Sequence, residues 1–287
     1  MDSKLRLLLV EHLHLGRWRA RRHEKLELDL QAAIAGCEIN LHYQPQYDLG
    51  SGRGSGVEAL ARWSRLDGEQ VPPAFFISVA EQLGLIDALG TSVLSRACSA
   101  MCEWPNGGLV PPTLSVNISA QQINERFCRT VGHILKATGF PAERLELEIT
   151  ESALIEDVDL ASQCLNEWKA LGVHIALDDF GTGYCGLNYL ARLSIDRLKL
   201  DKSFVQRMPF ERKTAAIVRS VFALGKELDI SVLAEGIETE RQCEMLAVFG
   251  CRDVQGDLLA KASAIDQART LLMQPWGQRW KRGLHAA

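Results

Sequence analysis

The feature that most constrains this chain is a regular alternation of short apolar runs with longer helical patterns along most of its length. A helical segment at 23–35 is followed by an extended stretch at 41–46, a turn rich in Gly and Ser at 50–56, and a second extended stretch at 57–63. The turn resembles a hairpin, so these two strands are expected to pair antiparallel. Further strands are predicted at 113–118, 145–149, 173–178, 197–200, 231–234 and 253–256, and helices at 73–89, 91–103, 120–138, 153–171, 213–228, 240–249 and 265–273.

Strands that alternate with helices of this length predict a mainly parallel sheet whose two faces are covered. About eight strands with no long linker between them favour a closed (β/α)₈ TIM-like barrel over an open, doubly wound sheet. No Gly-x-Gly-x-x-Gly follows the first strand, which argues against a dinucleotide-binding Rossmann fold. A chain of 287 residues fits one such α/β barrel and can bury its core without disulfides.

Composition limits the partners and the compartment of the protein. The formal net charge of −4 argues against general binding of DNA or RNA, which needs a basic excess. The apolar run at 5–10 is too short to span a membrane. Eight cysteines without a CxxC pair or a secretory signal indicate reduced thiols in a cytoplasmic protein. The domain prediction is an N-terminal connector or helical extension (1–22), a barrel (23–275) and a basic, aromatic C-terminal tail (276–287).

Polar residues follow or end most of the predicted strands. Because the carboxyl ends of barrel strands gather at one mouth, these side chains are expected to share a single site. They are Glu58, Asn117, Glu148, Asp178, Asp179, Lys199, Asp201, Glu235 and Gln255.

A single acid at a strand end is often only the N-cap of the following helix. That explanation fails for the set, because four or more carboxylates in one mouth repel one another unless cations neutralise them. Carboxylate oxygens with an Asn carbonyl suit hard ions such as Mg²⁺ or Mn²⁺. The adjacent Asp178 and Asp179 could serve two ions, an arrangement that stabilises the attacking and leaving oxygens of a phosphoryl displacement. The pattern predicts a metal-dependent phosphodiesterase.

Two further features belong to this mouth. Lys199 lies in an apolar strand, so its side chain is expected to point among the acids, where it could hold the attacking water or offset phosphoryl charge. The alternative is a structural ion pair. The segment 179–184 contains two glycines and follows the paired aspartates, which favours a mobile active-site loop over a plain turn.

Eight short motifs occur in order across about residues 25–262. They are YQP at 43–45, VEALARW at 57–63, VNIS at 116–119, EITE at 148–151, DDFGTGY at 178–184, KLDKSF at 199–204, AEGIET at 234–239 and QG at 255–256. A single Glu-Ala-Leu tripeptide would carry no weight, but the ordered set resembles the EAL domain family of cyclic di-GMP phosphodiesterases.

The resemblance implies a barrel whose first strand is antiparallel to the others, and hydrolysis of cyclic di-GMP to linear pGpG with two Mg²⁺ or Mn²⁺ ions. It also implies a homodimer and a sensor or cyclase domain fused to the barrel, because many members of the family have these features. The first ion would be bound by Glu58, Asn117, Glu148 and Asp178, and the second by Asp178, Asp179 and Glu235.

The resemblance also implies roles around the metals. Lys199 would position or activate the water, Glu235 could help, and the identity of the base stays open. Gln44 and Arg62 would contact the substrate, Arg62 at a phosphate. Glu151 would brace the loop that follows Asp179, and the metal and water network would be supported by Asp201, Glu238 and Gln255.

Three positions depart from the family pattern. Cys185 and Gly186 replace the usual two serines after the loop tyrosine, and Gly186 is expected to loosen the loop. Asp257 stands at a substrate-binding position where the family usually has an aromatic residue, so it adds negative charge near an anionic substrate. The proline usual after this block is absent from 260–262. Altered affinity or rate is expected, because no predicted metal ligand is changed.

Two alternatives stand beside the phosphodiesterase. A non-catalytic receptor for cyclic di-GMP would be expected after loss of acids from the mouth, whereas this chain keeps the full set. An unrelated barrel enzyme of the aldolase or enolase type would need a Schiff-base lysine or a dedicated acid–base pair, and it leaves Arg62 and the ordered motifs unexplained.

Overall fold

The computed structural model describes residues 26–36, 38–65, 67–103, 112–155, 157–181, 190 and 192–276. The chain divides into two compact units, one of residues 1–40 with 62–92 and one of 41–61 with 93–287. The predicted connector at 1–22 and all of the predicted tail except Trp276 lie outside the described residues.

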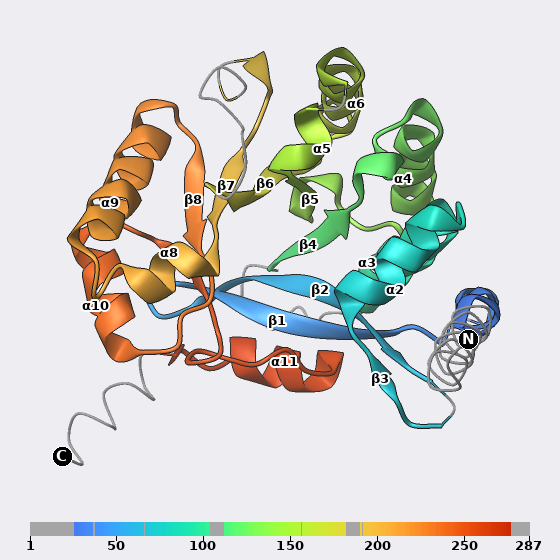
Figure 1. The fold of residues 1–287 in the computed structure, drawn as a ribbon, viewed down its shortest axis with the longest axis horizontal. Helices are drawn as coiled ribbons and strands as arrows, with labels where there is room; N and C mark the ends of the chain where they lie inside the picture. The colour runs from blue at the N-terminus through green and yellow to red at the C-terminus, as the bar shows by residue number, and fades with distance from the viewer. Residues whose placement is uncertain are drawn as a thin grey trace, which may run out of the picture. The chain divides into compact units, whose positions relative to one another are not determined.

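The larger unit contains a closed barrel of eight strands (Figure 1). Around the barrel the order is β1, β9, β8, β7, β6, β5, β4, β2, and pairing of β1 with β2 closes the ring. β1 is antiparallel to β9, whereas the pairs from β2 and β4 round to β8 and β9 are all parallel. The strands are β1 (Asn40–Asp48), β2 (Gly54–Ser64), β4 (Thr113–Ile118), β5 (Leu145–Thr150), β6 (His174–Phe180), β7 (Arg197–Leu200), β8 (Ser231–Ala234) and β9 (Asp253–Gln255).

This arrangement confirms the predicted α/β barrel with a reversed first strand. β5 is buried along almost its whole length, as expected of a parallel strand covered on both faces. The barrel strands are flanked by helices (Figure 1). In the larger unit these are the C-terminal part of α3 (Ile86–Cys102), α4 (Glu125–Thr138), α5 (Glu151–Ile155), α6 (Val158–Ala170), α8 (Lys202–Arg207), α9 (Arg212–Glu227), α10 (Glu240–Val248) and α11 (Ile265–Leu272), with short 3₁₀ turns η1 (Ala120–Gln122) and η2 (Ala142–Arg144).

The smaller unit has its own packing. It contains a helix at 26–35, the short strand β3 (Gln70–Val71), which pairs antiparallel with the end of β2, and α2 (Pro73–Gln82). The Trp63 and Phe76 rings meet edge to face at 6.0 Å between centroids, and Arg65 forms an ion pair with Asp29 at 2.6 Å. Both aromatic side chains are buried.

Several predicted helices are shorter than the sequence pattern indicated. The predicted helix at 120–138 is interrupted because Asn124 caps a new helix, its side chain accepting a hydrogen bond from the Phe127 N–H. The predicted helix at 153–171 is likewise divided, since Asp157 caps α6. α8 was not predicted; Asp201 is its N-cap and accepts from the Ser203 N–H.

No helix among the described residues is long and apolar enough to cross a membrane.

Candidate active site

The acidic residues of the larger unit come together where several parallel strands end. Asn117 on β4 lies beside Glu148 on β5 in the strand register. Asp178 lies next along the sheet, opposite Thr150, and β7 contributes Lys199. Because the register is fixed by parallel pairing, residues from distant parts of the sequence reach the same mouth.

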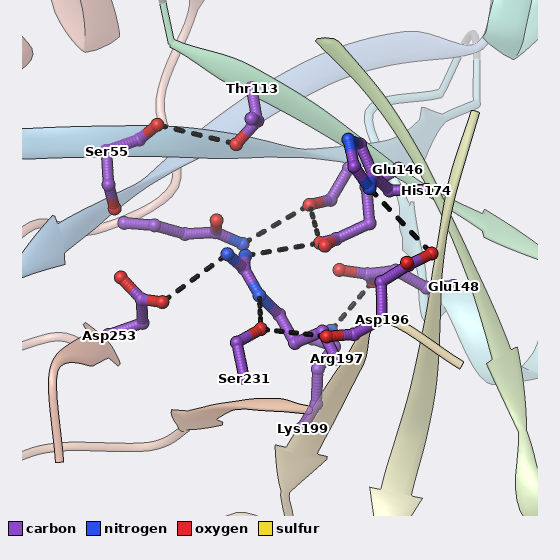
Figure 2. Close-up of polar contacts among 12 residues, drawn as sticks. Ser55, Thr113, Glu146, Glu148, His174, Asp196, Arg197, Lys199, Ser231 and Asp253 are labelled. Atoms are coloured by element: carbon purple, nitrogen blue, oxygen red, sulfur yellow. Dashed lines mark hydrogen bonds and ion pairs between the residues drawn. The ribbon is translucent and has the colours of Figure 1, made fainter. Parts of the chain in front are cut away.

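Lys199 is the centre of this group. Its side chain is 1% exposed, and its Nζ lies 2.7 Å from a Glu148 oxygen, 2.8 Å from Glu235, 3.3 Å from Asp178 and 3.8 Å from Glu58. Figure 2 shows the contact between Lys199 and Glu148. One ammonium group therefore faces four carboxylates from four different strands or strand ends.

The charges in this cluster shift one another. Burial alone would lower the pKa of Lys199, but the surrounding carboxylates, Glu148 foremost, hold that pKa well above its usual value. Burial and the charge of Glu58 raise the pKa of Glu148 well above its usual value. Burial raises the pKa of Glu235 to about 7 in spite of Lys199. More negative charge is gathered here than one ammonium group can neutralise.

Glu58 is the carboxylate most firmly held by neutral donors. The Asn117 amide donates to Oε1 at 2.7 Å, and Gln255 Nε2 donates to Oε2 at 2.6 Å. Burial alone would raise the pKa of Glu58, but Lys199 and these hydrogen bonds hold that pKa below its usual value. Glu58 is therefore kept ionised and in one orientation.

The cluster opens into a pocket of about 340 Å³. Gln44 reaches it from β1; its Oε1 accepts from Gln255 Nε2 at 3.2 Å and its Nε2 donates to the Ala260 carbonyl at 3.2 Å. The sequence interpretation gave no role to Leu60, Lys202, Gly236 and Gly256, which also line this pocket. The lining residues are Gln44, Glu58, Leu60, Asp178, Lys199, Lys202, Glu235, Gly236, Glu238, Gln255, Gly256 and Asp257.

Asp178 and Asp179 are less alike than their adjacency suggests. The register of β6 against β7 shifts between Leu177 and Phe180, and Asp179 has a φ of 55°. Asp178 is half-buried and forms the ion pair with Lys199, whereas Asp179 is exposed. Partial desolvation of its carboxyl by the surrounding protein and the neighbouring charge of Asp178 raise the pKa of Asp179. The irregularity turns the two carboxylates to different positions at the mouth.

Glu151 contacts the beginning of the predicted loop. Its Oε1 accepts a hydrogen bond from the Gly181 N–H at 2.7 Å. Gly181 has a φ of 97°, and a Cβ there would lie 2.8 Å from the Phe204 ring, so glycine is required at this point. The remainder of the loop at 182–189, with Cys185 and Gly186, lies outside the described residues. The bracing role of Glu151 stays a prediction.

Of the other predicted site residues, Asp257 and Glu238 line the pocket, whereas Asp201 and Arg62 do not. Asp257 lines the pocket, with its side chain 59% exposed and its carboxylate 4.0 Å from Lys261. Asp201 caps α8, and Glu238 accepts from Gln206 Nε2 at 3.1 Å while lining the pocket. Arg62 is half-buried on β2 and belongs to the smaller unit, so its contact with substrate stays a prediction.

The donor set fits divalent cations in its chemistry and charge. Glu148 Oε1 is buried without a hydrogen-bond partner, and Glu58, Asp178 and Glu235 contribute further oxygens to the same mouth. Hard ions such as Mg²⁺ and Mn²⁺ prefer such ligands. Among the described residues, no three His, Cys, Asp or Glu side chains are already arranged around a common ion position. The carboxylates are directed at Lys199 instead.

Comparison with known proteins identifies the family. The EAL domain matches residues 27–262. MucR of Pseudomonas aeruginosa, named a bifunctional diguanylate cyclase/cyclic di-GMP phosphodiesterase, is 38% identical over 86% of this chain and 37% of its own length. NbdA of the same organism, named a cyclic di-GMP phosphodiesterase, is 36% identical over 85% of this chain and 31% of its own length. The chain thus spans about a third of these relatives.

Solved structures agree with the sequence match. The MucR phosphodiesterase in complex with c-di-GMP superposes with a TM-score of 0.80 at 38% identity, covering 85% of this chain and 99% of that one. The FimX EAL domain of Xanthomonas citri in complex with c-di-GMP gives a TM-score of 0.78 at 26% identity, over 87% and 98% of the two chains. With its barrel, its ordered motifs and these matches, the chain belongs to the EAL domain family.

Proposed function

We propose that this chain is a cyclic di-GMP phosphodiesterase that hydrolyses its substrate to linear pGpG with Mg²⁺ or Mn²⁺. The observation that carries the proposal is the convergence of four carboxylates on the buried ammonium of Lys199 at the floor of the 340 Å³ pocket. A merely structural ion pair needs one partner, whereas this excess of negative charge suits cations and a phosphoryl substrate.

In this proposal Glu58, Asn117, Glu148 and Asp178 hold one ion, and Asp178, Asp179 and Glu235 hold the second. Two bound ions supply Lewis-acid stabilisation of the attacking and leaving oxygens of the phosphodiester. The proposal is supported by the donors Asn117 and Gln255, which already fix the orientation of Glu58.

Lys199 acts as a hydrogen-bond donor and not as the base. Its surrounding carboxylates hold its pKa well above the usual value, so the amine keeps its proton at neutral pH. It can therefore orient the attacking water and offset charge on the phosphoryl oxygens. The proton of the water passes to a carboxylate of the cluster; Glu235, whose pKa burial raises to about 7 in the metal-free protein, is proposed to assist.

Three further residues are proposed to contact the substrate. Gln44 is fixed by Gln255 and the Ala260 carbonyl, and it faces the pocket from β1. Arg62 is proposed to bind a phosphate, and Asp257 to lie beside the bound nucleotide. Glu151, Asp201, Glu238 and Gln255 are proposed to support the loop and the metal ligands.

The whole protein is proposed to be larger than this barrel. The relatives it matches are more than twice as long, and they include MucR and a protein of Escherichia coli named oxygen sensor protein DosP. A fused sensor or cyclase domain, a barrel at 23–275, a homodimer and a cytoplasmic location are proposed on this basis and on the sequence.

The test is turnover of cyclic di-GMP followed by chromatography with Mg²⁺ or Mn²⁺, with EDTA as the metal-free control. Glu58→Gln keeps the shape of the side chain but removes its charge, so formation of pGpG is expected to fall at least a hundredfold. Asp159→Asn, which alters a carboxylate that is 95% exposed, is the matched control and should leave turnover unchanged. Tight binding of cyclic di-GMP without product under either metal would refute hydrolysis and identify a receptor.

A further inference from the structure

The side chain of Gln46 is buried completely inside the barrel, beneath the acidic mouth. Residues 44 and 46 alternate with 45 along β1, so both glutamines project to the same face of the strand. Gln46 lies directly opposite Gln255 in the antiparallel pairing of β1 with β9. It is 0% exposed and does not line the pocket.

The carboxylate of Glu58 determines how Gln255 is oriented. An ionised carboxylate only accepts hydrogen bonds, so Gln255 must present Nε2 to it, at 2.6 Å. Gln255 Oε1 is then turned toward Gln46, whose Nε2 donates to it at 3.1 Å. No other donor to Gln255 Oε1 is found among the described residues.

A second carboxylate fixes Gln46 from the opposite end of the barrel. Ser115 Oγ donates its single proton to Glu146 Oε1 at 2.7 Å, so this oxygen can only accept from Gln46 Nε2, at 3.4 Å. Glu146 is itself held by Arg197 at 3.4 Å, and Arg197 also reaches Asp253 at 3.4 Å. Figure 2 shows Arg197 between these two carboxylates.

Both amide protons of Gln46 are thus used in hydrogen bonds, one to Gln255 Oε1 and one to Ser115 Oγ. The cost is that Gln46 Oε1 is buried with no hydrogen-bond partner. Space for this oxygen depends on Gly56, because a Cβ there would lie 2.6 Å from it. A Met or Leu would fill the same volume without an unpaired oxygen, so volume alone does not explain glutamine here.

We infer that Gln46 is a positioning residue, which locks the amide of Gln255 so that Gln255 holds Glu58 ready for a metal ion. The inference rests on the proposed function, since it concerns the ligand Glu58. Without the Gln46 donor, Gln255 Oε1 is left buried without a hydrogen bond, and the amide is held only through Nε2, by Glu58 and Gln44, so it places Glu58 less precisely. Loss of such a supporting hydrogen bond typically lowers metal affinity about 10- to 100-fold.

The test is Gln46→Met, which keeps the length of the side chain and removes both amide protons. Mn²⁺ affinity is measured without substrate, by competition with a fluorescent indicator, and turnover is measured separately against Mn²⁺ and cyclic di-GMP. The variant should bind Mn²⁺ about 10- to 100-fold more weakly and lose kcat, with KM for cyclic di-GMP changed less than twofold. In a Gln255→Met background, Gln46→Met should cause no further loss of Mn²⁺ affinity.

The results separate the inference from the proposed function. If the wild-type protein binds Mn²⁺ but forms no pGpG, hydrolysis is refuted, while a weaker-binding Gln46→Met still supports the positioning role. If Gln46→Met keeps wild-type affinity, or weakens it equally in the Gln255→Met background, the inference is wrong. If Gln46→Met does not fold, neutron diffraction from the deuterated wild-type protein tests the inference instead. A deuteron of Gln46 must then point to Gln255 Oε1, and the opposite orientation of the amide overturns the inference.

Discussion

Replacement of Lys199 by Met should destabilise the metal-free protein strongly, and more at high pH than at low pH. The substitution keeps an unbranched side chain in the barrel but removes the ammonium group that Glu148, Glu235 and Asp178 share within 3.3 Å. These carboxylates would then be left in a buried cluster without a positive partner.

The magnitude follows from the burial of the pair. Lys199 is 1% and the Glu148 side chain 0% exposed, and removal of one partner from such a buried pair costs about 3–5 kcal/mol. A loss of about 4 kcal/mol changes the unfolding equilibrium about a thousandfold. At pH 5.5 the loss should be smaller, because Glu148 and Glu235 have raised pKa values and can take up protons that replace the missing charge.

The assay is urea unfolding in EDTA at pH 8.0 and pH 5.5, followed by tryptophan fluorescence, and repeated at pH 8.0 with Mn²⁺. Mn²⁺ should restore most of the stability of Lys199→Met but not its turnover, because a cation can neutralise the cluster without replacing the donor. Lys202→Met is the matched control, since Lys202 lines the same pocket but is exposed; it should change stability by less than about 0.5 kcal/mol. A loss below about 1 kcal/mol for Lys199→Met at pH 8.0 would refute the view that this ammonium balances the cluster.

Three further predictions concern the same unit. The metal-free wild-type protein should lose stability as pH rises from 5 to 8. The folded protein keeps a proton on Glu235 up to a pKa of about 7, whereas the unfolded chain releases it near the usual value of 4.5. Urea midpoints in EDTA measure this, and a rise in stability across that pH range would contradict the prediction. Gly56→Ala should cost about 1–3 kcal/mol in urea unfolding, since its Cβ would lie 2.5 Å from Thr113 Oγ1 and 2.6 Å from Gln46 Oε1; an unchanged midpoint would show that the barrel yields at this point. Asp257→Asn should lower KM for cyclic di-GMP up to about fivefold at low salt, because it removes a negative charge from the pocket. The difference in KM should vanish in 0.5 M NaCl, and a difference that persists at high salt would exclude charge as the cause.

The barrel could be predicted from sequence because its strands carry strong local signals. Three of the predicted strands, β4, β7 and β8, have the bounds seen in the structure, and β4 and β8 each lie between patterns with clear helical periodicity. Helix boundaries were harder, since a cap such as Asn124 or Asp157 interrupts an apolar pattern that continues on both sides. α8, at six residues, is too short to show a helical period of its own.

The candidate site could be predicted only as a set of residues at one mouth. The register shift that separates Asp178 from Asp179 depends on how β6 meets β7, and an unbroken run of sequence gives no sign of it. The convergence of the carboxylates on Lys199 depends likewise on the register of neighbouring strands. Gln46 was overlooked because its importance comes from Gln255, which is 209 residues away in the chain.

The closure of the barrel has a consequence for how the protein is made. One edge of β1 pairs with β2, but its other edge finds its partner only when β9 has left the ribosome, since Gln46 pairs with Gln255, and contacts of such long sequence separation form slowly. Until then β1 presents an unpaired edge, which makes the nascent chain prone to pair with other strands. The same late step delivers Gln255 to Glu58, so a chain interrupted before β9 would have neither a closed barrel nor a completed mouth. Closure of the barrel and completion of the mouth therefore both depend on one strand of three residues.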